Sequence, residues 1–318
     1  MAIQTKLGKA FEYACLQSLQ SHLIDNQIVK LEENTSLSVT RSFYESADAK
    51  MKKKMNLGAD AAVKVILRLE PQLENSSTNI PLILSVQEDA KGIVGDVRDV
   101  LCVRKQNEWE IGISCKHNHS AIKHSRLSSL IDFGKQWFDI PCSKQYFERI
   151  DQLFDELKEM KKNNMLWRDV VNKDKRFYIP LLNAFMEELK RLDVNNPRIV
   201  PERMLHYLLG RKDFYKVITL DTKRLTQVQA FNIYGTLNRN SGSIRPQTKI
   251  QQLNMPTKFY DIDFKMNSSN TINITCDGGW AISMRIHSAS SKVEPSLKFD
   301  IGLIGVPATL YKHYESWE

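Results

Sequence analysis

A β-hairpin with acidic residues at its start and a lysine at its end is the feature that most constrains this chain. Residues 100–103 predict one strand, residues 105–107 a polar turn, and residues 109–116 the return strand. Side chains alternate across a strand, so Ser114 and Lys116 share one face. Pairing the strands about the turn brings Asp99 and Lys116 to the same end of the hairpin. We therefore expect a carboxylate and an ammonium group to lie close together there.

A carboxylate beside a lysine suits metal-assisted hydrolysis of a phosphodiester. The acid holds a divalent cation, and the ammonium group orients a water and offsets charge on the phosphate. The alternative is structural, because acids and lysines also mark the ends of ordinary solvated strands. The hairpin taken alone leaves both interpretations open.

The residues after the lysine form a cationic segment. Residues 120–137 predict a helix, because apolar side chains recur there at a period of roughly 3.6 residues. No acidic residue lies between Lys116 and Asp132. A basic, hydroxyl-rich surface suits a nucleic-acid backbone, although a solvated helix face would look similar. The candidate DNA contacts here are His117, Asn118, His119, Lys123, His124, Ser125 and Arg126.

Motifs along nearly the whole chain support one family. They occupy residues 8–15, 95–99, 111–119, 123–128, 131–134, 207–210, 213–216, 279–287 and 294–300. Together they resemble the HaeIII family of type II restriction endonucleases, within the PD-(D/E)xK nuclease superfamily. The resemblance implies an α/β (α+β) fold, with a mixed sheet flanked by helices. It also implies Mg²⁺-dependent cleavage of double-stranded DNA at the palindrome GGCC, cut centrally to blunt ends with 5′-phosphates, with Mn²⁺ able to substitute.

One position departs from the superfamily pattern. An acid normally stands two residues before the lysine, and here that residue is Ser114. A serine hydroxyl is a poor ligand for Mg²⁺, so a second carboxylate must come from elsewhere or be absent. The candidates are Asp96, Glu12 on a predicted first helix, and Glu88 with its neighbour Asp89. With Asp99, the backbone carbonyl of Cys115 is a further possible metal ligand.

Three segments are expected along the chain, and they can also fuse into one domain. Residues 1–140 are the nuclease core with the hairpin and basic helix, residues 141–212 are helical, and residues 213–318 are a β-rich recognition segment. Helices are predicted at 6–23, 42–69 with an interruption near 56–58, 143–161, 174–192 and 201–209. Further strands are predicted at 81–86, 214–220, 228–234, 271–276, 280–287 and 297–301.

Sequence recognition is expected in the β-rich segment. Guanine presents O6 and N7 in the major groove, and arginine or lysine can bind both acceptors. The candidates are Arg239, Arg245, Arg285, His287, Lys292 and Lys298. A palindromic target also predicts a two-fold homodimer. The resemblance further implies a cognate DNA methyltransferase acting on the same site.

Composition agrees with a nucleic-acid partner. The net charge is +8 and the pI is about 9.1, which favours polyanions. The five cysteines show no zinc-finger spacing, so reduced thiols are expected. Since no apolar run approaches the roughly 20 residues of a membrane span and no signal peptide is evident, we expect a bacterial cytoplasmic protein.

Three alternatives remain open at this point. A ββα-metal nuclease would use His117 or His119 as a general base or metal ligand. A repair or recombination nuclease would share the core but read DNA structure. Ser114 also permits a non-catalytic DNA-binding protein whose active site has decayed.

Overall fold

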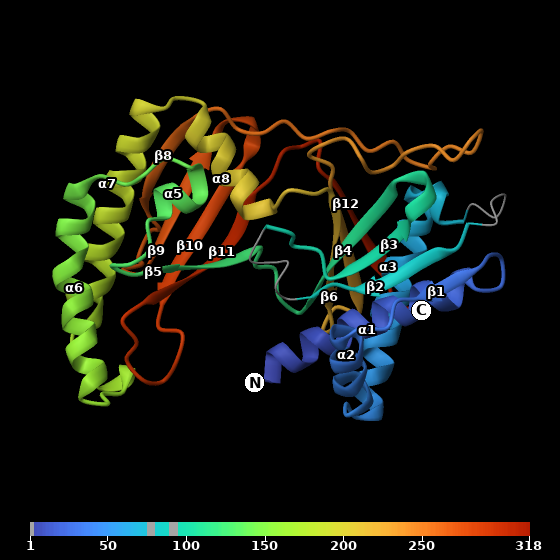
Figure 1. Cartoon of the computed structure of the whole chain (residues 1–318), viewed down its shortest axis with the longest axis horizontal. Coiled ribbons are helices and arrows are strands. Elements are labelled where there is room, and N and C mark those ends of the chain that lie inside the picture. Colours follow the sequence, from blue (N-terminus) through green and yellow to red (C-terminus); the bar gives the residue numbers. More distant parts are fainter. Residues whose placement is uncertain (1–2, 75–79, 89–94) are drawn as a thin grey trace. The chain divides into compact units, whose positions relative to one another are not determined.

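The computed structural model describes residues 3–74, 80–88 and 95–318 (Figure 1). These residues form two compact units that interleave along the chain. The first comprises Met1–Ser120, Gly210–Leu253 and Thr309–Glu318, and the second comprises Ala121–Leu209 and Asn254–Ala308. Strands from the segment 213–318 therefore contribute to both units.

The first unit contains a seven-stranded mixed sheet. In spatial order its strands are β1 Val29–Leu31, β2 Leu82–Val86, β3 Val100–Arg104, β4 Trp109–His117, β6 Phe214–Leu220, β7 Leu225–Phe231 and β12 Tyr311–Ser316. The pairs β1–β2 and β4–β6 are parallel, and the other pairs are antiparallel. Its helices are α1 Ile3–Leu23, α2 Thr35–Glu45 and α3 Ala49–Leu69.

One face of this sheet is covered by helices. Helix α1 packs on β2, β3 and β4, and α3 packs on β6, β7 and β12. Ile111 and Ile113 of β4 enter the same core as Val217 of β6. Because side chains alternate, Ser114, Lys116 and Lys216 lie on the opposite face, which we call the polar face.

The helices of the first unit begin where the sequence offers a cap. The side chain of Asn34 accepts a hydrogen bond from Leu37 N–H at the start of α2, and Asp48 does the same for Met51 at the start of α3. Such caps satisfy amide groups that have no partner within the helix. The chain therefore breaks between Glu45 and Ala49.

The interruption expected near residues 56–58 is wrong, because α3 runs through it. A Cβ on Gly58 would lie 2.6 Å from Thr219 and 3.1 Å from Trp317. The glycine therefore allows close approach of the helix to the sheet and does not end the helix.

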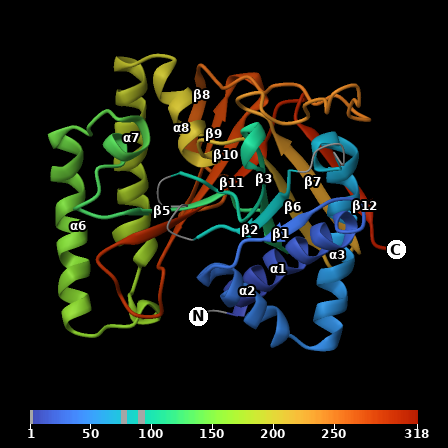
Figure 2. The ribbon, with the colours of Figure 1, turned by 45° about the vertical axis from the view of Figure 1, so that its right-hand side comes forward.

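The second unit contains a five-stranded antiparallel sheet (Figure 2). In spatial order its strands are β5 Lys123–Leu127, β11 Leu297–Gly305, β10 Ala281–His287, β9 Thr271–Cys276 and β8 Phe259–Phe264. Its helices are α5 Phe133–Phe138, α6 Lys144–Lys162, α7 Ile179–Asn195 and α8 Ile199–Leu209. A π-helical turn, Asp174–Tyr178, leads into α7.

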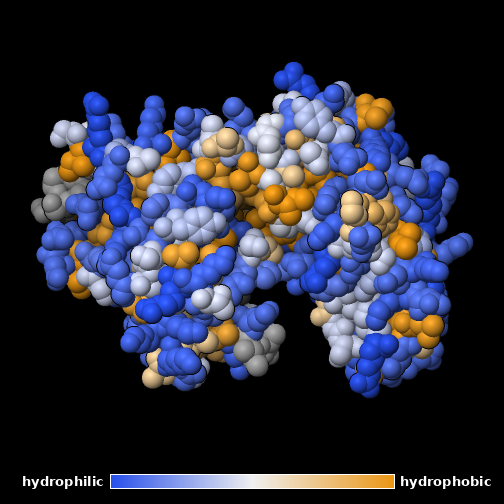
Figure 3. Space-filling view, turned by 180° about the vertical axis from the view of Figure 1, so that it is seen from behind, coloured by the Kyte–Doolittle hydropathy of each residue, from blue (hydrophilic) through white to orange (hydrophobic). Residues whose placement is uncertain are grey.

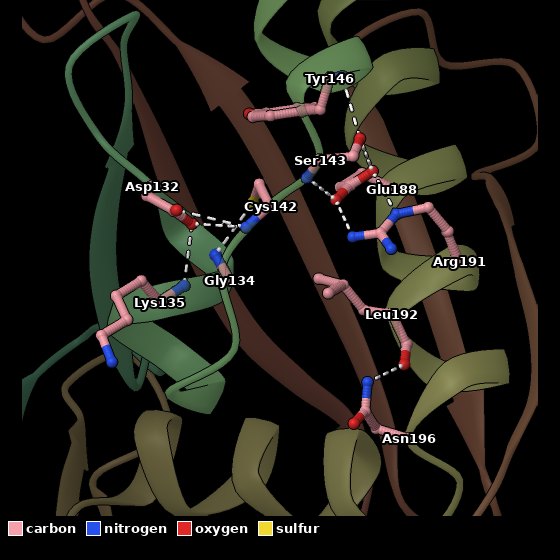
Figure 4. A network of polar contacts seen from close by, with 10 residues as sticks. All are labelled: Asp132, Gly134, Lys135, Cys142, Ser143, Tyr146, Glu188, Arg191, Leu192 and Asn196. Atoms are coloured by element: carbon pink, nitrogen blue, oxygen red, sulfur yellow. Dashed lines mark hydrogen bonds and ion pairs between the residues drawn. The ribbon is translucent and has the colours of Figure 1, made fainter.

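A buried carboxylate joins two helices of this unit. Glu188 on α7 accepts hydrogen bonds from Ser143 N–H at 2.6 Å and Ser143 Oγ at 2.8 Å, directly before α6 (Figure 4). Arg191 lies 2.7 Å from the same carboxylate. The pair neutralises a charge that burial would otherwise penalise.

The helix predicted at residues 120–137 is wrong. Residues 123–127 form β5, which pairs with β11, and only Phe133–Phe138 is helical. Along β5 the side chains of Ser125 and Leu127 are buried, whereas His124 and Arg126 are exposed. That alternation has a period of two, and pairing with a distant strand overrides the local helical pattern.

The predicted fold class is confirmed: the protein has an α/β architecture with a mixed sheet flanked by helices. The helices and strands predicted elsewhere are present with boundaries that shift by a few residues. Hydrophilic side chains cover much of the face drawn in Figure 3. Among the described residues, no helix has the length and apolar content to cross a membrane.

Candidate active site

The hairpin brings Asp99 and Lys116 together on the polar face. Asp99 directly precedes β3, and its N–H donates to the Ile113 carbonyl at 2.8 Å. Lys116 near the end of β4 places Nζ 3.1 Å from Asp99 Oδ2. Both side chains keep partial solvent access, at 27% for Lys116 and 20% for Asp99. The pair is therefore ordered by the sheet and remains reachable from outside.

Two further donors fix the carboxylate of Asp99. The N–H of Cys115 donates to Oδ2 at 2.7 Å, and Ser114 Oγ donates to the same atom at 3.3 Å. The N–H and C=O of a strand residue point to the same side of the strand. The carbonyl of Cys115 is therefore directed toward the side where Asp99 lies.

Glu12 on α1 is the second carboxylate of the site. It is 6% exposed, and Lys9 Nζ lies 3.1 Å from its Oε2. Burial, followed by the nearby charge of Asp99, raises the pKa of Glu12 to about 8. Two carboxylates this close repel each other, and an added cation would relieve that repulsion.

Lys116 is held in its ammonium form. Burial lowers its pKa, but Asp99 and then Glu12 favour the charged form, and the net effect is a raised pKa. A protonated lysine can orient a water molecule or offset phosphate charge, but it cannot accept a proton.

Asp96 serves another partner. Its Oδ2 lies 2.6 Å from the guanidinium of Arg98, which also contacts Glu110 at 3.2 Å. Burial raises the pKa of Asp96, but these bonds to Arg98 outweigh it and lower the pKa overall. Glu88 is exposed, and Asp89 lies outside the described residues. Glu12 is thus the candidate acid that the structure brings to Asp99.

The residues after Lys116 fasten β4 to β6. The N–H of Asn118 donates to Thr219 O at 3.1 Å, and its Oδ1 accepts from Asp221 N–H at 2.9 Å. His117 Nε2 lies 3.3 Å from Asp221, and its ring lies 6.2 Å from that of Phe11. His119 is exposed. The position of His117 suits a structural anchor better than the general base of a ββα-metal site.

In the second unit, two of the expected DNA contacts point inward. Lys123 Nζ donates to Tyr207 O at 2.8 Å and lies 3.8 Å from the centre of its ring. Ser125 Oγ is 3.0 Å from the Tyr207 hydroxyl. These two residues stabilise the packing of β5 on α8.

Other expected contacts gather on one face of the five-stranded sheet. Strand register aligns His124, Asp300 and Arg285 in one row, and Arg126, Lys298 and His287 in the next. Asp300 lies 3.3 Å from Arg285 and 3.5 Å from His124. We call the five basic members of these rows the basic grid: His124, Arg126, Arg285, His287 and Lys298. Three distant segments of the chain therefore form one surface.

The remaining candidates lie in loops. Arg239 and Arg245 are exposed in the first unit, where Arg239 lines a pocket of about 440 Å³ with Arg98 and Arg211. Lys292 is exposed in the second unit and pairs through its backbone with Leu166.

Lys216 is a site residue that the sequence analysis missed. It is 3% exposed, and its Nζ donates to Ser120 O at 2.6 Å. Burial and then the charge of Lys116 lower its pKa to about 7. A lysine within an otherwise apolar strand, residues 214–220, was the available signal.

The comparisons with known proteins agree with this geometry. Residues 8–307 match the model of the family described as HaeIII restriction endonuclease. The chain is 44% identical over 311 residues to the type II restriction enzyme HaeIII of Haemophilus aegyptius, covering 98% of this chain and 97% of that protein. No solved structure shows significant similarity. With agreement across nearly its whole length, this chain belongs to the HaeIII family of restriction endonucleases.

Proposed function

We propose that this protein cleaves both strands of DNA at the palindrome GGCC, using Mg²⁺ at the site formed by Asp99, Glu12 and Lys116. The observation that carries the proposal is the contact between Lys116 and Asp99 at 3.1 Å on the catalytic hairpin. The arrangement agrees with a PD-(D/E)xK core in which Glu12 replaces the acid absent at position 114.

The donor set fits a magnesium ion. Asp99 and Glu12 offer carboxylate oxygens, and the Cys115 carbonyl offers a third oxygen, which are the ligands that Mg²⁺ prefers. No three acidic, histidine or cysteine side chains cluster as a metal site within the described part of the chain. Water and phosphate oxygens would therefore complete the coordination, as is usual for Mg²⁺.

The proposed chemistry is an in-line displacement. Water attacks the phosphorus, the bond from phosphorus to the 3′ oxygen breaks, and that oxygen takes up a proton. The products carry 5′-phosphate and 3′-hydroxyl ends. When bound, Mg²⁺ stabilises charge on the phosphate and promotes ionisation of the water. The ammonium group of Lys116 orients the water and offsets charge on the phosphate.

The basic grid is the proposed surface for reading bases. Arginine can donate both hydrogen bonds that guanine O6 and N7 accept, and Arg126 and Arg285 are exposed there. The loop residues Arg239, Arg245 and Lys292 are proposed to contact the backbone. Since a blunt central cut needs both strands of a palindrome, we propose a two-fold homodimer. A methyltransferase acting on the same sequence would protect the host DNA.

Digestion of a plasmid of known sequence tests this function. We expect cuts only with Mg²⁺ or Mn²⁺, and sequencing of the fragment ends should place every cut at the centre of GGCC. Cuts at nicks or junctions would instead indicate a repair nuclease. DNA binding without cleavage in either metal would indicate a decayed active site.

A further inference from the structure

Lys216 lies beside the position where the superfamily acid is missing. In the parallel pairing of β4 and β6, Lys216 is the register partner of Ser114. Partners across neighbouring strands point to the same face, at Cβ distances of about 5 Å. Lys216 therefore shares the polar face with Lys116 and Asp99.

A lysine is expensive in this position. Its side chain is almost wholly buried, and lysines are rarely buried unless they are paired. The charge of Lys116 disfavours its protonation further, and burial and this charge together lower its pKa to about 7. Two neighbouring ammonium groups are stabilised where additional negative charge arrives, as when a DNA phosphate enters the site.

Ser114 and Lys216 complement each other. An acid at position 114 would pair with Lys216 across the strands, and it would crowd Asp99, whose Oδ2 lies 3.3 Å from Ser114 Oγ. Compared with the superfamily pattern, the chain thus has one metal ligand fewer and one buried cation more.

We infer that each subunit works with a single divalent ion and that Lys216 provides the positive charge that a second ion would otherwise supply. This inference rests on the proposed function. Lys216 is a positioning residue in this scheme: its charge acts across the strand pair, and its bond to Ser120 O fixes the loop that follows β4.

The test counts metal ions without relying on cleavage. The full-length protein is bound to a GGCC duplex carrying a non-cleavable phosphorothioate, and bound Mn²⁺ is counted by electron paramagnetic resonance. We expect one Mn²⁺ per subunit in the unmodified protein and in Ser114→Asp, where the new acid pairs with Lys216. The double variant Ser114→Asp/Lys216→Met should bind two, because the new acid is then released to hold metal.

Cleavage rates give a second readout. Single-turnover cleavage by Lys216→Met should fall by ~10- to 100-fold, and Lys216→Arg should recover part of that loss because it keeps the charge. The matched control is Lys312→Met, since Lys312 is exposed at the far end of the same row through Gln229. We expect its rate to remain within about twofold of the unmodified protein, as distant exposed charges are screened.

Two Mn²⁺ ions per subunit in the unmodified protein would overturn the inference, and so would full activity of Lys216→Met. If Lys216→Met does not fold, as its melting curve would show, the ion counts for the unmodified protein and Ser114→Asp decide the question. Asp99→Asn separates the two levels: full activity there would refute the proposed function itself. An inactive Asp99→Asn beside a fully active Lys216→Met would refute only the role of Lys216.

Discussion

Replacing Glu12 with glutamine should stabilise the metal-free protein and at the same time impair cleavage. The carboxyl of Glu12 has an ordinary pKa of 4.5, which burial and then Asp99 raise to about 8 in the folded state. The folded state therefore binds more protons than the unfolded state between these values, and stability must fall as the pH rises through this window. Glutamine removes the ionisable group and with it this loss.

The expected effect is large for one side chain. Each pKa unit corresponds to about 1.4 kcal/mol, so ionising Glu12 in the folded protein costs on the order of 5 kcal/mol above pH 8. Near pH 4 the carboxyl is protonated in both states, and the variant should then match the parent closely. The gain in stability should thus appear only as the pH rises.

Urea unfolding at several pH values between 5 and 8.5, with and without Mg²⁺, measures this effect. Mg²⁺ should stabilise the parent at pH 8 more than Glu12→Gln, because the variant lacks one proposed metal ligand. The control is Glu33→Gln, since Glu33 is exposed and pairs with Arg41. Equal pH dependence in Glu12→Gln and the parent would refute the argument, and so would normal cleavage by Glu12→Gln.

Three other changes test the rest of the structure. Asp99→Ala or Lys116→Ala should abolish cleavage and retain metal-free DNA binding, measured by gel shift; normal turnover would remove that residue from the mechanism. Arg285→Ala should relax specificity at one base pair by ~1–3 kcal/mol, scored by competitive cleavage of single-mismatch sites, and an unchanged profile would leave it a structural role. Gly112→Ala should destabilise the protein by ~2–4 kcal/mol, because the new Cβ would lie 2.0 Å from Arg98 Cδ; denaturation at parental urea concentrations would contradict this packing.

The hairpin illustrates what local pattern predicts well. The alternation of residues 100–116 and the polar turn between them predicted both strands, and the structure has them at Val100–Arg104 and Trp109–His117. Asp99 and Lys116 meet because they are linked by one short turn, so their proximity needs little information from elsewhere in the chain.

The basic grid illustrates where local pattern fails. Residues 123–127 looked helical in isolation, yet they form the edge strand β5 beside β11. The burial available on a distant strand decided between the two periods. Arg126 and Arg285 consequently lie on one surface, although the sequence placed them in different segments.

The sequence by itself determined the family, the fold class and the paired acid and lysine of the hairpin, because motif order and short-range periodicity belong to the chain itself. Only the tertiary structure decided that Glu12 reaches Asp99 from α1, that Asp96 pairs with Arg98 instead, and that Lys216 stands opposite Ser114. These neighbours come from distant parts of the chain. Their proximity depends on which strands and helices bury their apolar faces together, and no local spacing encodes that choice.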